Sequence, residues 1–191
     1  MRVAVLFFSL AVFIFGAEYT TSVSSLYQEG DSKVIGRLLP TVEVKVLGKV
    51  QDKTKVEFEG YIQEGSPNAI YFAPNRRILV AGMVKTTKFD YKVLETLKDD
   101  GKTWNKISVS LLSDETEFTN DINGLYQKAQ KMYSDNCSIC HVLHNTKEFN
   151  ANQWPSMVNS MLSRTAISKD ESYLLIQYLQ KNASNMPWHK Q

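Results

Sequence analysis

The hydrophobic pattern changes its period once along this chain of 191 residues. From residue 31 to about residue 112, apolar side chains alternate with polar ones, as in the stretch TVEVKVLG that begins at Thr41. After the polar stretch 113–121, apolar residues recur every three or four positions. Alternation predicts strands with one buried face, and the longer spacing predicts amphipathic helices. The sequence therefore predicts a β part followed by a helical part.

Six stretches of the first part have the composition of short strands, with turn residues between them. Asp100 and Gly101 form one such turn, a pair suited to a tight hairpin. Short antiparallel strands at this density predict a small barrel or sandwich. The six stretches are residues 41–48, 55–62, 69–72, 77–84, 92–97 and 104–112.

Three helices are expected in the second part. Asp121 is a suitable N-cap for the first, and Asn152 for the second, which has Pro155 in its first turn. The third begins with a capping box formed by Ser168 and Glu171.

Residues 1–17 have the pattern of an export signal. Arg2 precedes an apolar run from Val3 to Phe15 that contains one polar residue, Ser9, and Ala17 ends the segment before polar residues begin. The run is too short to cross a bilayer comfortably. The pattern predicts a cleaved signal peptide and a periplasmic protein, with membrane attachment only if the signal stays uncleaved.

The formal net charge is +2, and no basic block is interleaved with aromatic residues, so a nucleic-acid partner is not indicated. The sequence contains no recognisable pair of catalytic carboxylates, phosphate-binding glycine loop or Ser/His arrangement. We therefore do not expect an enzyme.

The chain has only two cysteines, Cys137 and Cys140, and His141 follows the second. This spacing is the attachment pattern of haem c, because two thiols three residues apart can add to the vinyl groups on one porphyrin edge. The adjacent imidazole then reaches the iron. The motif predicts one covalent haem c, tethered by Cys137 and Cys140 and ligated by His141.

Three other interpretations of the motif fit less well. A structural zinc site needs a second pair of ligands, and His144 and His189 lack the usual spacing. A thioredoxin-like pair follows a strand, whereas a helix is expected here. A local disulfide is compatible with export, but the motif uses both cysteines of the chain and helices are expected on both sides of it.

The helical part resembles the single-haem c-type cytochromes. AQKMYSDNCSICH is similar to their first helix running into the attachment site, and LLIQYLQ to their closing helix. More narrowly, CSICH, ANQWPSMVNSM and DESYLLIQYLQKNAS resemble the C-terminal haem domain of pentahaem cytochromes that donate electrons to periplasmic reductases of trimethylamine N-oxide and other S- and N-oxides. The β region resembles the SH3-like segment beside that domain.

The resemblance implies a fold of class α+β with two modules. A small SH3-like antiparallel β-barrel would occupy residues 18–118, and an all-α class I cytochrome c-like domain would occupy residues 119–191.

The second axial ligand of the iron decides whether the haem transfers electrons or binds small molecules. Candidates are His144, Met157, Met161, Met186 and His189. His144 is only three residues from His141, too few for the chain to pass around the ring edge, and Met186 and His189 follow the closing helix near the end of the chain. The resemblance implies Met161, seven residues after a tryptophan, and Met157 remains an alternative one turn away.

The resemblance also implies a function, that of an electron carrier of anaerobic respiration. The acceptor would be a periplasmic molybdenum reductase. The four-haem module that oxidises quinol in those relatives does not appear in this sequence, so an upstream cytochrome or another quinol-oxidising protein would be the donor. Two alternatives stay open: a haem-based peroxidase or ligand sensor with an open or weak sixth position, and an adaptor that acts through its SH3-like part.

Overall fold

The computed structural model describes residues 17–189. Residues 1–16, which hold nearly all of the predicted signal peptide, lie outside the described part. Within the described part, no helix has both the length and the apolar character needed to cross a membrane.

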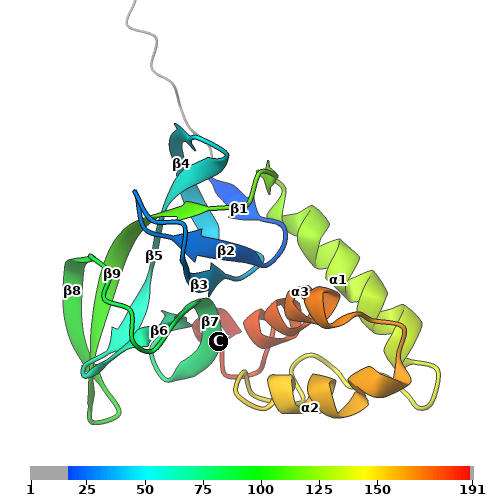
Figure 1. Ribbon diagram of the computed structural model, residues 1–191. Helices are drawn as coiled ribbons and strands as arrows, with labels where there is room; N and C mark the ends of the chain where they lie inside the picture. The colour runs from blue at the N-terminus through cyan, green and yellow to red at the C-terminus, as the bar shows by residue number, and fades with distance from the viewer. Residues whose placement is uncertain (1–16, 190–191) are drawn as a thin grey trace, which may run out of the picture.

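Ten antiparallel strands form one continuous sheet in the order β10-β1-β4-β5-β6-β7-β3-β2-β9-β8. A further pairing between β5 and β9 closes six of them into a barrel, to which the other four are added (Figure 1). The strands are β1 (Glu18–Thr20), β2 (Ser24–Tyr27), β3 (Val34–Leu38), β4 (Glu43–Val50), β5 (Lys53–Gln63), β6 (Ser66–Ala73), β7 (Arg76–Met83), β8 (Lys92–Asp99), β9 (Lys102–Ser113) and β10 (Phe118–Thr119).

Strand β5 shows how the alternating pattern builds the barrel. Val56, Phe58 and Ile62 are at most 3% exposed and point into the core. Gly60 lies on the same inward face, where a Cβ atom would stand 2.5 Å from a methyl carbon of Ile70. Only glycine lets β6 approach so closely at this point.

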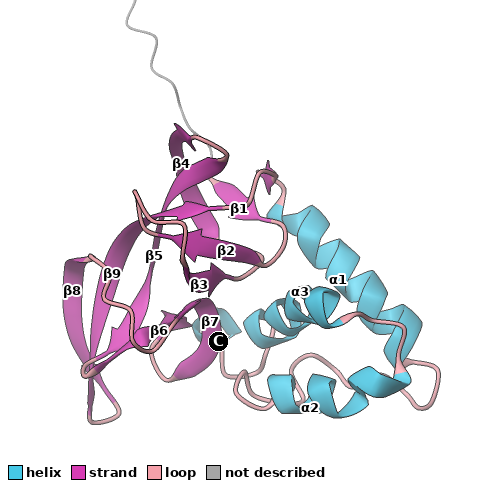
Figure 2. Cartoon of the chain, viewed as in Figure 1, coloured by secondary structure: helices cyan, strands magenta, loops and turns pink. Residues whose placement is uncertain are grey.

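The helical part consists of α1 (Ile122–Cys137), α2 (Trp154–Met161) and α3 (Lys169–Lys181), with 3-10 turns η1 (Leu162–Arg164) and η2 (Pro187–His189) (Figure 2). The predicted caps of two helices are confirmed. An oxygen of Asp121 accepts a hydrogen bond from the Gly124 amide at 2.9 Å, and Ser168 and Glu171 form a complete capping box.

The predicted cap of α2 is wrong by one residue. Gln153 occupies the N-cap position and makes no side-chain cap bond. The side chain of Asn152 instead accepts a hydrogen bond from the Arg77 amide at 2.6 Å and donates one to the Asn75 carbonyl oxygen at 3.1 Å. Asn152 therefore joins the start of α2 to the β6–β7 turn.

The predicted fold class, α+β with a small SH3-like barrel and a separate all-α class I cytochrome c-like domain, is wrong. Residues 17–189 are mostly β, with ten strands in one sheet and only three α-helices. The helices also do not enclose a core of their own, because Ile78 of β7 is fully buried in the same cluster as Trp154 and Leu175. Three short helices cannot cover their apolar faces by themselves, and the barrel wall completes their core. The predicted boundary at residues 118 and 119 falls within β10, and the domain limits remain a prediction.

Polar side chains of α3 bind the backbone of the barrel. The amide nitrogen of Gln177 donates to the Leu79 carbonyl oxygen at 2.7 Å, and that of Gln180 donates to the Arg77 carbonyl oxygen at 3.1 Å. Figure 1 shows α3 lying between β7 and α1, with α2 below it. These bonds fix the position of α3, and with it the helical part, relative to the sheet.

Candidate haem site

The two cysteines lie at the C-terminal end of α1. Cys137 is the last residue of the helix, and Cys140 and His141 follow in the turn after it. Both thiols are free; that of Cys137 is half-buried and that of Cys140 is exposed. Burial raises the pKa of the Cys137 thiol. The Cys137 thiol is therefore harder to ionise than an exposed thiol.

A largely apolar cavity lies between the end of α1, α2 and the start of α3. It brings together four of the predicted site residues, Cys137, His141, Met157 and Met161, while Cys140 lies outside the lining. The rest of the lining is Tyr133, His144, Trp154, Val158, Leu162, Thr165, Ile167 and Leu175.

His141 presents one ring nitrogen for ligation. Its Nδ1 atom is 2.7 Å from the carbonyl oxygen of Val142. Because a carbonyl only accepts, Nδ1 carries the proton, and the lone pair is left on Nε2. A backbone hydrogen bond of this kind orients a ligating imidazole.

Tyr133 and Trp154 hold the loop that follows His141. The Tyr133 hydroxyl donates to the His144 carbonyl oxygen at 3.0 Å, and the Trp154 indole donates to the Thr146 carbonyl oxygen at 3.1 Å. Burial raises the pKa of Tyr133 to about 12, so this hydroxyl stays protonated and keeps donating at physiological pH. The two rings meet edge to face with centroids 6.2 Å apart.

The two methionines of α2 both reach the cavity. They lie four residues apart, so one helical face presents both. Met157 is partly buried against the helical core, and Met161 is 41% exposed. Met186, another candidate from the sequence, is fully buried in that core and does not line the cavity.

His144 also lines the cavity, which the sequence did not lead us to expect. Its ring lies 5.2 Å from that of His141 and 5.1 Å from that of Phe149, centroid to centroid. Its Nδ1 atom is 2.9 Å from a carboxylate oxygen of Glu148. The four-residue spacing of His144 and Glu148 is the one sequence signal for this pair, and it is too common to identify a site.

The donor set fits haem c. Two free thiols flank a turn, an imidazole with an available Nε2 follows them, and two thioether sulfurs reach the same cavity. Val158, Leu162 and Leu175 supply the apolar wall that a porphyrin face needs. Among the described residues, no three His, Cys, Asp or Glu side chains gather into a metal site of their own.

Comparison with known proteins identifies the family to which the chain belongs. A family model described as the TorC third cytochrome c domain matches residues 16–118. The chain belongs to this TorC cytochrome family. The matched segment comprises the barrel strands and ends before Cys137, so the family assignment does not depend on the haem motif.

Individual members of the TorC and TorY group match over more of the chain. It is 31% identical over 171 residues to the cytochrome c-type protein TorC of Escherichia coli K12, covering 87% of this chain and 44% of that protein. It is 32% identical over 152 residues to the cytochrome c-type protein TorY of Haemophilus influenzae, covering 78% of this chain and 41% of that protein. The chain thus spans less than half the length of these relatives. No solved structure matches it.

Proposed function

We propose that this protein is a monohaem c-type cytochrome of the periplasm that delivers electrons to a terminal reductase, with a molybdenum N-oxide or S-oxide reductase as the acceptor. The observation that carries the proposal is the single cavity into which Cys137, His141 and the α2 methionines project. The relatives' names, which describe c-type cytochromes, support it.

Each of the proposed haem-binding residues has a separate role. Cys137 and Cys140 would form the two thioether bonds, His141 would bind iron through Nε2, and Met161 would supply the second iron ligand, with Met157 as the alternative. The bound haem supplies reversible one-electron chemistry between Fe(II) and Fe(III). A methionine ligand raises the reduction potential relative to a second histidine and leaves no open position for small molecules.

Surrounding side chains give the site apolar contacts and a fixed loop. Val158, Leu162 and Leu175 would place apolar side chains against the haem, which disfavours the more highly charged oxidised state. The bonds from Tyr133 and Trp154 keep the loop after His141 in one conformation. The protein then acts as a carrier and not as a catalyst.

The proposed partners are an upstream cytochrome or quinol-oxidising donor and the downstream reductase. Export through residues 1–17 would bring the chain to the compartment of both. The barrel would serve as a docking or spacing module between them.

The test is direct electron delivery. The protein, reduced under anaerobic conditions, is mixed with a periplasmic N-oxide reductase, and the haem absorption is followed by stopped flow. We expect rapid reoxidation only when both the reductase and trimethylamine N-oxide are present. Omitting the N-oxide is the matched control.

Carbon monoxide distinguishes the carrier from a sensor or peroxidase. A methionine-ligated haem binds the gas poorly, so the spectrum of the reduced protein should barely change on its addition. Ready binding by the unmodified protein, together with no reoxidation by the reductase, would exclude the carrier function. A Cys137→Ser, Cys140→Ser double variant should purify without covalent haem, which verifies the attachment residues separately.

A further inference from the structure

The hydrogen bond of the His141 ring is made to the next residue in the chain. Its Nδ1 atom lies 2.7 Å from the carbonyl oxygen of Val142, and Val142 is 90% exposed. This bond therefore ties the imidazole to its own exposed turn and not to the core of the protein. A contact with a better anchored residue is needed to fix the plane of the ring.

The ring of His144 supplies such a contact. Its centroid lies 5.2 Å from that of the His141 ring, and the two ring planes are tilted by 60°. Both residues line the cavity described above, so the contact lies beside the space available to a porphyrin. Residues that touch a metal ligand from behind commonly set its orientation.

His144 is itself held at its backbone and at its ring. Its carbonyl oxygen accepts the bond from the Tyr133 hydroxyl at 3.0 Å. Its Nδ1 atom lies 2.9 Å from a carboxylate oxygen of Glu148, and because that oxygen accepts, Nδ1 carries the proton. The ring of Phe149 packs on it with centroids 5.1 Å apart.

Phe149 connects this group with the helical core. Its ring meets that of Trp154 nearly at a right angle, with centroids 5.0 Å apart, and Trp154 is only 2% exposed. Its carbonyl oxygen also accepts from the amide of Ser184 at 3.4 Å and from the hydroxyl of Ser184 at 3.3 Å. A continuous row of ring contacts thus leads from His141, through His144 and Phe149, to a buried residue.

We infer that His144 is a positioning residue for the iron ligand His141. Its ring, held by Glu148 and Phe149, sets the plane of the imidazole that binds iron. This inference rests on the proposed function, because it requires a haem bound through His141. It goes further, since the attachment motif itself ends at His141 and gives His144 no part.

The experiment is electron paramagnetic resonance of the ferric, haem-loaded protein, because the g values of low-spin haem depend on the orientation of the axial imidazole. The thioether bonds keep the haem attached when the ligand is loosened, so the signal reports on His141. We expect one set of g values for the wild type. His144→Ala should replace it with a broadened or split signal. His144→Phe keeps an aromatic ring against Phe149 and should restore the single set.

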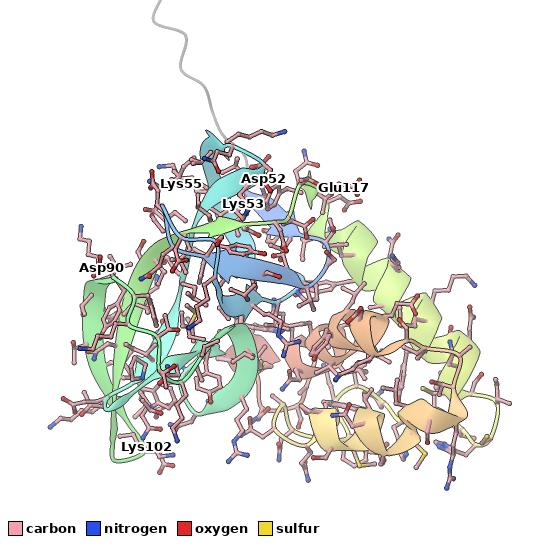
Figure 3. The ribbon with its side chains drawn as sticks, in the orientation of Figure 1. Asp52, Lys53, Lys55, Asp90, Lys102 and Glu117 are labelled. Atoms are coloured by element: carbon pink, nitrogen blue, oxygen red, sulfur yellow. The ribbon has the colours of Figure 1, made fainter. Side chains whose placement is uncertain are left out.

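Variants at Glu148 test the support of the ring. Glu148→Gln keeps an oxygen that accepts from His144 and should leave the signal unchanged, whereas Glu148→Ala should broaden it. Asp90→Asn is the matched control for the charge lost in Glu148→Gln and should have no effect. Figure 3 places Asp90 on the side of the barrel away from α1 and α2. If His144→Ala does not fold, the comparison of Glu148→Ala with Glu148→Gln decides in its place.

A His144→Ala protein with the g values of the wild type would overturn this inference alone. So would a His144→Phe protein whose signal is as broad as that of His144→Ala, because the ring would then not be what positions the ligand. A wild-type protein without covalent low-spin haem would instead overturn the proposed function, and this inference with it.

Discussion

The side-chain nitrogen of Lys181 lies 2.8 Å from the carbonyl oxygen of Thr41 and 2.9 Å from its hydroxyl oxygen. These bonds join the end of α3 to the β3–β4 connection, where Thr41 has a left-handed backbone with φ of 63°. The nitrogen also lies 4.7 Å from the ring centroid of Phe72. No carboxylate among the described residues pairs with it, and burial lowers the pKa of Lys181 to about 7.

Stability should therefore depend on pH through Lys181. Its pKa is 10.5 when unfolded and about 7 when folded, so between these values the unfolded chain holds one more proton. The free energy of unfolding therefore rises by on the order of 4 kcal/mol for this group as pH increases across that window. Lys181→Met should remove that rise, as measured by urea unfolding at several pH values. Lys169→Met, an exposed lysine on the same helix, should keep the wild-type slope. Parallel curves for wild type and Lys181→Met would contradict the expectation.

Met161→Ala should remove the sulfur ligand of the proposed haem. We expect loss of the weak red absorption band of sulfur-ligated ferric haem and tighter binding of carbon monoxide in the reduced state. The reduction potential should fall by on the order of 100 mV, well within the range of about 0.8 V that axial ligands control. Met157→Ala is the matched control, since both side chains line the cavity. If Met157→Ala alone produces these changes, the ligand assignment passes to Met157.

Ile78→Ala should destabilise the barrel and the helices together. The residue lies in β7 but is fully buried in the helical core, so its truncation leaves a cavity that costs about 2–5 kcal/mol. Circular dichroism of the backbone and of the haem should lose signal in one shared transition at a lower temperature. Leu47→Ala, at a residue 43% exposed, should change stability by only about 0.5 kcal/mol or less. Two separate transitions in the wild-type protein would show that the parts unfold independently.

Haem-free protein should react unequally at its two thiols. Cys140 is exposed, whereas Cys137 is half-buried with a raised pKa, so fewer Cys137 side chains are thiolates at neutral pH. Iodoacetamide should modify Cys140 severalfold faster, as followed by peptide mass spectrometry. In concentrated urea the two rates should become similar. Equal rates in the folded protein would mean that the cavity does not bury Cys137 before haem is attached.

Local patterns in the sequence predicted local structure well. The six expected strands overlap β4 to β9, and the caps at Asp121 and Ser168 form as their residue types require. Strands β1, β2, β3 and β10 have at most five residues each, which is too few for alternation to stand out. The closure of the barrel by β5 and β9 depends on pairing between distant segments, which no local pattern encodes.

Errors in the helical part have a common physical cause. Gln177 and Gln180 look like solvent-facing residues of an amphipathic helix, yet both are buried because they bind strand carbonyls. Ile78 looks like an ordinary strand residue, yet it completes the helical core. The predicted site residues line one cavity, except Cys140, and most of them are close together in the sequence. That His144 also lines this cavity could not be predicted without knowing the path of its loop.

The position of α3 in the sequence determines when the cavity wall is completed, as well as where the helix packs. During synthesis, β7 emerges before Cys137 and Cys140, and α3 emerges after them. The cavity wall that contains Leu175 is thus missing until α3 docks on the sheet. An attachment machinery would meet both thiols on an open, half-built surface, and docking of α3 would then enclose the cofactor.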